Sequence, residues 1–386
     1  MRNRIVIALL VLLVGYFAFY ILFYTAFLNI PIMKTPSVTA FIQDESFLAV
    51  KKPFPEQETL LSRFVMNHFV SDSGAVYSTP PAISKEPVVL SESIGLLMDY
   101  AILKGDKELF YKELDYLKEK MLTENHLVRW KVSKGAAGCN AAIDDLRIIR
   151  TLLEAYNLWQ DEDCLNMAGV MQESLYRLQV NQGDFFEFYD WKTDKAMNRS
   201  PLCYFDLYTI DRISVFNEGW GEVANRGLDI IKNGRYSDTS PFFYKYYDYI
   251  KGEYFPDEEY SKSRGICLTY TLYTVLHLAE VNEDTGFFTE WLKEQNEKGR
   301  IYGWYNPNTG EPSNQMESTA VYALAAIYAD KVGEKELSRD LIEKMLQFMI
   351  TNEKSPFLGG YGDENTRSFY SFDNLTALWA LSTANR

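Results

Sequence analysis

Three acidic residues stand where three apolar helical patterns begin. Glu92 opens a pattern that runs to Met98, Asp145 opens one that runs on to Tyr156, and Asp206 follows a loop rich in aromatic residues. If these helices belong to one bundle, their starting residues can meet at the same rim. Carboxyl groups that meet there can do acid–base chemistry, one donating a proton and another activating a water molecule. The spacing therefore predicts an acid–base centre made of carboxylates.

The elements that must position these acids show the three- and four-residue apolar spacing of α-helices. This spacing predicts helices at residues 57–70, 90–104, 107–122, 142–159, 162–180, 204–216, 218–234, 263–281, 316–330, 334–351 and 370–383. The linkers alternate between short charged turns and long aromatic loops, such as 181–203 and 300–314. Since binding residues concentrate on long loops, we expect an all-α toroid of helical hairpins with its long loops on one face.

The aromatic content also bears on the ligand. Phe, Trp and Tyr make up 15% of the chain, and exposed rings of this kind can stack on the apolar faces of sugars. Most of these rings must form the core. Trp130, Trp191 and Tyr204 are the candidates that we single out for contact with a carbohydrate.

The order of the short motifs resembles glycoside hydrolase family 8. Ser91-Glu92-Ser93, Ile143-Asp144-Asp145-Leu146 and Ser200-Pro201-Leu202-Cys203-Tyr204-Phe205 look like three motifs of this family, and the resemblance spans roughly residues 56–384. It implies an (α/α)6 barrel and an inverting endoglycanase without a cofactor. It also implies that Glu92 is the general acid and that Asp145 contacts a sugar. Among such proteins, the chain resembles the membrane-anchored PssZ-type hydrolases associated with bacterial exopolysaccharide production.

The chain departs from the family where the general base is expected. The matching segment is Tyr260-Ser261-Lys262-Ser263-Arg264, with Ser261 in place of the aspartate, and Arg264 is kept as a candidate for substrate binding. We rank Asp206 first and Asp211 second as the base. These two residues point about 140° apart on one helix, so at most one faces the cleft squarely. The acidic cluster 257–259 is an alternative, although a solvated turn explains it as well.

The first turn of a helix lowers the pKa of a carboxyl group, which is the wrong direction for a general acid. Glu92 therefore requires burial or a neighbouring carboxylate, such as Asp145, to keep its proton. The ordinary structural interpretation of the same residues makes Ser91 an N-cap and Glu92 a first-turn acid.

Other kinds of site have little support in the sequence. His68, His126 and His277 lie far apart and outside any metal-binding motif, so we expect no metal and no other cofactor. The formal net charge of -14 argues against a nucleic acid partner. Four cysteines at irregular spacing permit disulfides, but buried thiols explain them equally well.

The first residues predict a membrane anchor. Residues 5–28 carry no charge and follow two arginines, which is typical of an uncleaved signal anchor with a cytoplasmic N-terminus. We therefore expect an anchor at 1–30, a stalk at 31–55 and an extracytoplasmic hydrolase-like domain at 56–386. Its partners would be the polysaccharide, the membrane and proteins of exopolysaccharide synthesis or export. An inactive glycan-binding relative and a polysaccharide lyase are the alternatives.

Overall fold

The computed structural model describes residues 53–256 and 265–386. The α-helices in these ranges are α3 (Pro55–His68), α4 (Ser91–Lys104), α5 (Lys107–Tyr116), α6 (Ala142–Trp159), α7 (Glu162–Gln179), α8 (Leu207–Ile213), α9 (Gly219–Asn233), α10 (Leu268–Glu280), α11 (Gly286–Glu297), α12 (Thr319–Lys331), α13 (Lys335–Leu346) and α14 (Ser371–Ala384). A π-helical turn, η1 (Leu117–Met121), extends α5, and a 3-10 turn, η2 (Leu202–Tyr204), precedes α8.

Short antiparallel strands occupy the loops. They are β1 (Val89–Leu90), β2 (Lys131–Val132), β3 (Val180–Asn181), β4 (Asp184–Phe185), β5 (Tyr189–Asp190), β6 (Lys195–Ala196), β7 (Arg199–Pro201), β8 (Tyr246–Asp248), β9 (Glu253–Phe255), β10 (Ile266–Cys267) and β11 (Trp304–Tyr305). Strands β1 and β2 pair just before α4, and β10 and β11 pair just before α10. The strands β7, β8 and β9 form a three-stranded sheet.

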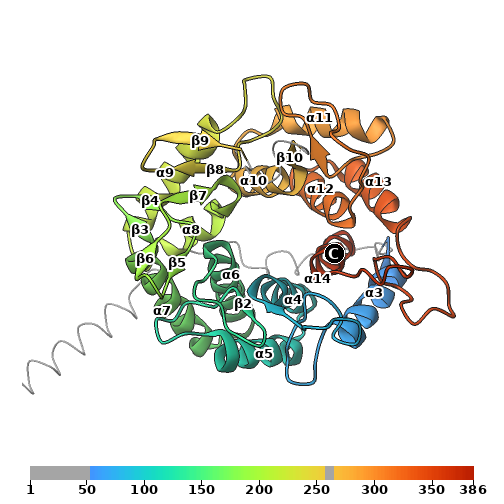
Figure 1. Ribbon diagram of the computed structural model, residues 1–386, viewed down its shortest axis with the longest axis horizontal. Coiled ribbons are helices and arrows are strands. Elements are labelled where there is room, and N and C mark those ends of the chain that lie inside the picture. Colours follow the sequence, from blue (N-terminus) through green and yellow to red (C-terminus); the bar gives the residue numbers. More distant parts are fainter. Residues whose placement is uncertain (1–52, 257–264) are drawn as a thin grey trace, which may run out of the picture. The chain divides into compact units, whose positions relative to one another are not determined.

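The helices form two concentric rings (Figure 1). The inner ring runs α4, α6, α8, α10, α12 and α14, and it closes because α14 contacts α4. The outer ring contains α3, α5, α7, α9, α11 and α13. Because inner and outer helices alternate along the chain, the inner helices run in the same direction. Their N-terminal ends therefore share one face of the ring.

Burial explains which helices lie inside. Helix α12 is buried along almost its whole length, from Ala320 to Ala329, and α14 is buried nearly as completely. A helix that is apolar all round must be surrounded by protein. The outer helices α9 and α13, by contrast, bury one apolar stripe and present charged residues outside. The apolar pattern of each helix therefore decides its ring.

The turns between the rings have specific helix-ending and helix-starting residues. Gly105 ends α4 with a φ of 64°, a left-handed conformation that suits glycine. The Asp106 carboxylate then accepts a 3.0 Å hydrogen bond from the Leu109 amide and caps α5. Asp161 caps α7 in a similar way through the Asp163 amide. These caps make the short charged linkers into tight hairpin turns.

A buried glutamate of α3 ties the two ends of the ring together. The Glu58 carboxylate accepts hydrogen bonds from Ser382 Oγ and Asn385 Nδ2, and Lys104 Nζ lies 2.7 Å away. The Asn385 side chain in turn accepts a hydrogen bond from the Phe54 amide. The last helix is therefore fixed to the first hairpin by polar contacts as well as by packing.

The fold agrees with the expected all-α toroid, with two differences in the outer ring. Helix α11 was not predicted, although its Phe288 and Leu292 are fully buried. The helical unit begins earlier than residue 56, since Phe54 is buried and α3 starts at Pro55. The predicted anchor and most of the predicted stalk lie outside the described residues. Within the described ranges, no helix combines the length and the apolar character that crossing a membrane requires.

Candidate active site

A cavity of about 350 Å³ lies at the N-terminal ends of the inner helices. Its lining comes from α4, α6, η2, α10, α14 and the loops before them: Leu90, Glu92, Trp130, Ala141, Ile143, Asp144, Arg147, Cys203, Tyr204, Thr269, Tyr270, Tyr273 and Phe372. Glu92 and Asp144 are the carboxylates of this lining as far as the described residues go. The parallel inner helices therefore bring together side chains that are up to 282 positions apart in the sequence.

Glu92 has the properties of a proton donor near neutral pH. Its side chain opens onto the cavity from the first turn of α4. Burial by the surrounding protein and, after it, the nearby charge of Asp144 raise the pKa of Glu92 to about 7, against the opposing effect of Arg147. To keep its proton, Glu92 was expected to need either burial or a neighbouring carboxylate. The structure supplies both, and the neighbouring carboxylate is Asp144.

Asp144 caps α4 from the neighbouring helix. Its Oδ2 accepts a 2.5 Å hydrogen bond from Ser91 Oγ, and its carboxylate also accepts the Glu92 backbone N–H. Ser91 is thus not the N-cap that its position predicts. It is the first residue of the helix, and its hydroxyl is a donor to Asp144. The Glu92 amide at the start of α4 finds its acceptor in α6, which fixes Glu92 and Asp144 next to each other.

Arg147 holds the other side of Asp144. Its Nη1 lies 3.6 Å from Asp144 Oδ1, its Nε lies 3.8 Å from Asp99 Oδ2, and its Nη2 donates a 3.4 Å hydrogen bond to Tyr273 Oη. The aliphatic part of Arg147 passes over Gly95, where an added Cβ would stand 2.9 Å from Cδ. A glycine on α4 is therefore what lets the guanidinium of α6 reach the cavity floor.

Aromatic rings form much of the cavity wall. Trp130, which is 36% exposed, and Tyr204 line the cavity as the sequence predicted for carbohydrate contact. Tyr270 and Tyr273 of α10 and Phe372 of α14 complete the wall. Such a mixture of flat rings and a few fixed polar groups is typical of a site for a small polar molecule or one unit of a polymer.

The expected role of Asp145 is wrong in this structure. Asp145 is fully buried and does not line the cavity. Its Oδ1 accepts the Val128 amide at 2.8 Å, and its Oδ2 accepts Asn140 Nδ2 at 2.6 Å. Burial raises the pKa of Asp145 to about 8. Asp145 therefore anchors the loop that leads to Trp130, while the preceding residue, Asp144, faces the cavity.

Neither candidate for the general base reaches the cavity. Asp206 is 3% exposed and caps α8 by accepting the Thr209 amide and hydroxyl, at 3.0 and 2.6 Å. Asp211 is exposed on the outside of the same short helix. The 3-10 turn η2 puts Tyr204 at the cavity and carries the chain inward, so α8 begins only at Leu207. The sequence pattern, which predicted one helix from residue 204, could not show this.

The remaining candidates divide between the core and the undescribed segment. Trp191 packs against the core, with the Arg129 guanidinium 5.1 Å from its ring centre, and it is not part of the cavity lining. Arg264 and Ser261 lie outside the described residues. The four cysteines are all described and all are free thiols.

Sequence analysis missed several residues of the site. Asp144 was passed over for its neighbour, although a period of 3.6 residues lets only one of two adjacent acids face the cavity. Arg147 stands one turn after Asp144, on the same face of α6. Tyr270 and Tyr273 share a face of α10 by the same spacing. Polar and aromatic residues at three-residue spacing near the start of a predicted helix share one face of it. This spacing was the signal that could have identified these residues.

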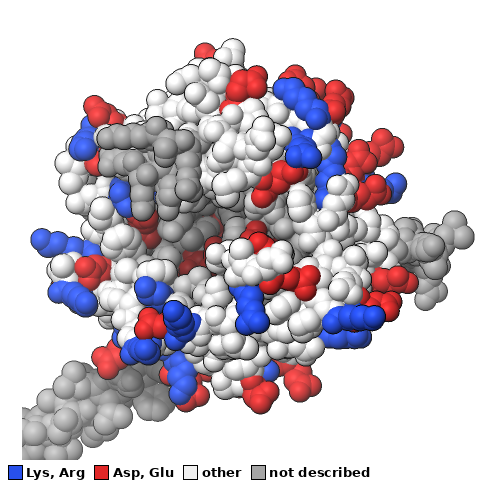
Figure 2. Space-filling model, turned by 45° about the vertical axis from the view of Figure 1, so that its right-hand side comes forward, with Lys and Arg blue, Asp and Glu red and all other residues white. Residues whose placement is uncertain are grey.

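The surface around the ring carries no strong excess of one charge on the face that Figure 2 shows. Lys, Arg, Asp and Glu side chains alternate there among uncharged residues, and acidic atoms are visible deep in the hollow of that face (Figure 2). A basic face of the kind that binds nucleic acid is not seen in this view.

Comparisons with known proteins agree with this geometry. The chain is 32% identical over 326 residues to "Putative lipoprotein YdaJ" of Bacillus subtilis, covering 82% of this chain and 84% of the relative. No family model matches the sequence. Among solved structures, a protein described as a novel alpha-amylase from Clostridium perfringens superposes with a TM-score of 0.78 at 31% identity, covering 85% of this chain and 97% of its own.

More distant structures share the fold. PssZ from Listeria monocytogenes has a TM-score of 0.67 at 21% identity, covering 83% of this chain and 94% of its own. A family 8 endoglucanase from Klebsiella pneumoniae has a TM-score of 0.60 at 16% identity, covering 85% of this chain and all of its own. The predicted resemblance is confirmed: the ring is the (α/α)6 fold of the family 8 endoglucanases and PssZ. The chain belongs to the family of YdaJ from Bacillus subtilis.

Proposed function

We propose that this protein is a glycosidase that hydrolyses a polysaccharide outside the cytoplasmic membrane, with Glu92 as the general acid. The observation that carries the proposal is the position of Glu92. A carboxyl group whose pKa is raised to about 7 opens onto an aromatic cavity next to Asp144. A protonated carboxyl group of this kind can donate to the oxygen that leaves when a glycosidic bond breaks.

In the proposed reaction, the rings of Trp130 and Tyr204 hold sugar units beside Glu92. Glu92 donates its proton to the leaving oxygen, and an ionised carboxylate deprotonates the attacking water. An inverting reaction of this kind places the two carboxyl groups about 6.5–9.5 Å apart. The candidates for the second group are Asp144 and the acidic residues of segment 257–264, which lies outside the described residues.

The proposed location follows from the expected N-terminal anchor, and the description of YdaJ as a lipoprotein supports membrane attachment. A tethered hydrolase would meet a polymer as it leaves the cell, so we propose the cell's own exopolysaccharide as the substrate. Proteins of exopolysaccharide synthesis or export are the proposed neighbours. The similarity to an alpha-amylase adds α-linked glucans to the polymers that must be tested.

The experiment compares reducing ends released by the wild type and by Glu92→Gln. The polymers are native exopolysaccharide, an α-1,4-glucan, a β-1,4-glucan and a xylan. We expect the substitution to lower kcat/KM by at least about 100-fold on the polymer that is cleaved, because a general acid contributes about that much or more. Glu336→Gln, at an exposed position of α13, should leave the rate unchanged.

The product of the same reaction also tests the mechanism. Inversion predicts that proton NMR detects first the anomer opposite to that of the substrate. Retention would contradict inversion but leave Glu92 as the acid. Full activity of Glu92→Gln would overturn the assignment of the acid. An unsaturated product that absorbs in the ultraviolet would instead identify a lyase.

A second function, glycan binding without hydrolysis, is favoured by one observation. Asp144 is already engaged by the Ser91 hydroxyl and the Glu92 amide, and Asp206 and Asp211 lie away from the cavity. If the wild type binds a polymer in affinity electrophoresis but releases no ends from it, this second function replaces the first.

A further inference from the structure

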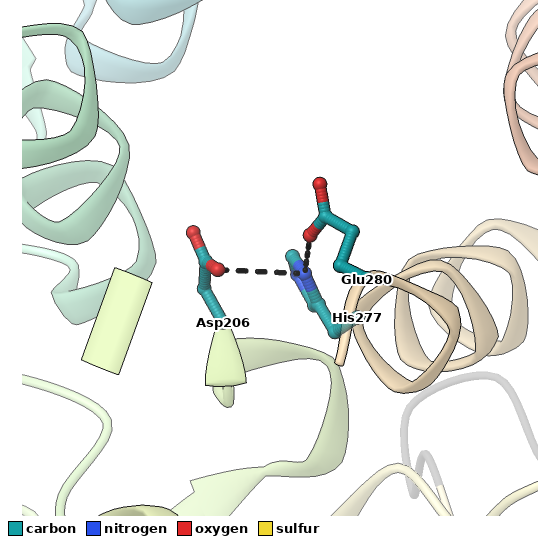
Figure 3. Close-up of side chains that lie close together, drawn as sticks. All are labelled: Asp206, His277 and Glu280. Carbon is teal, nitrogen blue, oxygen red and sulfur yellow. Dashed lines mark hydrogen bonds and ion pairs between the residues drawn. The ribbon is translucent and has the colours of Figure 1, made fainter. Parts of the chain in front are cut away.

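A second cluster of polar side chains lies between α8 and α10, outside the cavity lining. Figure 3 shows Asp206, His277 and Glu280 with their polar ends turned toward one another. His277 Nδ1 lies 3.3 Å from Glu280 Oε2 and 3.9 Å from Asp206 Oδ1, and the three atoms lie within 4.8 Å of one another. One nitrogen and two carboxylate oxygens therefore converge on a small volume.

The other oxygen of each carboxylate is held by a donor from outside the cluster. Asp206 Oδ2 accepts a 2.6 Å hydrogen bond from Thr209 Oγ1. Glu280 Oε1 accepts a 2.7 Å hydrogen bond from Arg150 Nη2. This division orients each carboxylate so that its remaining oxygen points toward His277. Ligands of bound metal ions are commonly oriented by such outer hydrogen bonds.

The charge of the described groups around the cluster is negative. Glu280 Oε1 lies 2.7 Å from Arg150 Nη2, and Glu280 Oε2 lies 3.3 Å from His277 Nδ1. Asp206 Oδ1 accepts the Thr209 amide at 3.0 Å, and Asp206 Oδ2 accepts the Thr209 hydroxyl at 2.6 Å. Arg150 is the cation that pairs with both carboxylates, and Asp99 adds a further carboxyl group near it. Glu280 is also the last residue of α10, where the helix end carries partial negative charge.

The cluster lies in a poorly solvated place. His277 is 5% exposed, Asp206 is 3% exposed, and the Glu280 side chain is 7% exposed. Two like charges held apart by less than 5 Å repel strongly unless a cation lies between them. Arg150 reaches only the outer oxygens, Asp206 Oδ2 and Glu280 Oε1. The inner oxygens face His277 Nδ1, and Asp206 Oδ1 also accepts the Thr209 amide.

We propose that His277 Nδ1, Asp206 Oδ1 and Glu280 Oε2 bind one divalent transition-metal ion, with Zn²⁺ or Mn²⁺ as the ions that fit. An imidazole nitrogen with two carboxylate oxygens suits these ions better than Mg²⁺ or Ca²⁺, which prefer oxygen ligands alone. The ligand atoms must move closer together for all three to coordinate one ion, and water would complete the coordination. The ion would join the start of α8 to the end of α10 inside the ring.

This site is independent of the proposed hydrolysis, since none of the three ligands lines the cavity. Its expected effect is on the inner ring. Helix α8 has only seven residues and lies between α6 and α10 in that ring. A metal bridge from Asp206 to α10 would hold this short helix in place, so removal of the metal should lower the thermal unfolding midpoint.

The test uses the purified full-length chain, stripped with a chelator and titrated with ZnCl₂ by calorimetry. We expect one saturable site per chain and a higher unfolding midpoint in the presence of the ion. His277→Gln should abolish both effects. His68→Gln, which changes a half-buried histidine on α3 outside the cluster, is the matched control and should behave as the wild type.

Thr209→Val supplies a graded test that leaves all three ligands in place. It removes the hydroxyl that orients Asp206, and the expected loss of Zn²⁺ affinity is about 10- to 100-fold. If His277→Gln does not fold, Thr209→Val still tests the proposed metal site. The proposal is overturned if the wild type shows no saturable site, if His277→Gln binds as the wild type does, or if Thr209→Val keeps full affinity.

Discussion

Single residues decide the chemistry of the cavity. Adjacent acids of α6 have opposite environments: Asp144 faces the cavity and Asp145 is fully buried with both oxygens bonded. One position along the helix turns the side chain by about 100°. The cavity acid therefore acts on its neighbour Glu92 by charge, while the buried acid acts on a loop by hydrogen bonds.

Asp144→Asn tests the charge contact between the two cavity carboxyl groups. The substitution removes a negative charge that raises the pKa of Glu92, and it leaves Arg147 free to lower this pKa. A general acid is active only while protonated, so activity falls as the pH rises through its pKa. We expect the alkaline limb of the kcat/KM profile, near pH 7 in the wild type, to move to lower pH in Asp144→Asn.

The pH profile distinguishes this role from simple structural damage. A purely structural loss would lower kcat/KM at every pH without moving the limb. An unchanged limb would therefore contradict the charge contact, whatever happens to the absolute rate.

At the scale of elements, the site depends on how closely α4 and α6 approach each other. Gly95 has no side chain at the point where the aliphatic part of Arg147 crosses α4. The Ser91 hydroxyl and the Glu92 amide at the start of α4 bond to Asp144 of α6. The two helices are thus joined by a steric fit and by a shared cap, one turn apart.

Gly95→Ala tests the steric fit. The new methyl group would stand 2.9 Å from Arg147 Cδ, so the arginine must shift away from Asp144. We expect kcat/KM to fall by about 10- to 100-fold, because displacements of an ångström near a catalytic group have effects of this size. Stability should change little, because the higher helix propensity of alanine, worth up to about 1 kcal/mol, offsets the cost of displacing the arginine.

Gly221→Ala is the matched control for this substitution. Gly221 lies in the outer helix α9, where an added Cβ meets nothing within 4 Å. The control should gain stability and keep its activity. Equal activity of the two alanine variants would show that the contact between Gly95 and Arg147 is not needed.

At the scale of the whole molecule, closure of the ring leaves some acids deep in protein. Glu113 of α5 is fully buried, and neither of its oxygens has a hydrogen-bond partner among the described residues. Burial raises the pKa of Glu113 to about 8 from an ordinary value of 4.5. Between about pH 4.5 and pH 8, the folded protein therefore retains a proton that the unfolded chain has already released.

This difference predicts how stability depends on pH. The unfolded chain releases the proton near pH 4.5, so the folded state loses relative stability as the pH rises from there to about 8. The loss is about 1.4 kcal/mol for each unit by which the pKa is raised. In Glu113→Gln, denaturant unfolding measured from pH 5 to pH 8.5 should show a flatter decline of the unfolding free energy.

Glu108→Gln is the control, because Glu108 lies on the same helix but is exposed. It should keep the pH dependence of the wild type. If the unfolding free energy of Glu113→Gln declines with pH as steeply as that of this control, the buried carboxyl group does not govern the pH dependence of stability.

The sequence by itself predicted the class of fold, most of the helices and, through the resemblance to family 8, Glu92 as an acid that lines the cavity. These features depend on local information: the apolar period, the linkers, and an acid at the start of an apolar helix. Helix α11 was missed although Phe288 and Leu292 stand at the four-residue spacing of a buried helix face.

The tertiary structure alone decided which acids meet. The choice of Asp144 over Asp145 depends on the rotation of α6 against α4, and the removal of Asp206 from the cavity depends on the turn η2. The convergence of Asp206 with His277 and Glu280 joins residues 71 or more positions apart, through packing of α8 on α10. Such proximity arises from closing the ring, and no local pattern in the sequence encodes it.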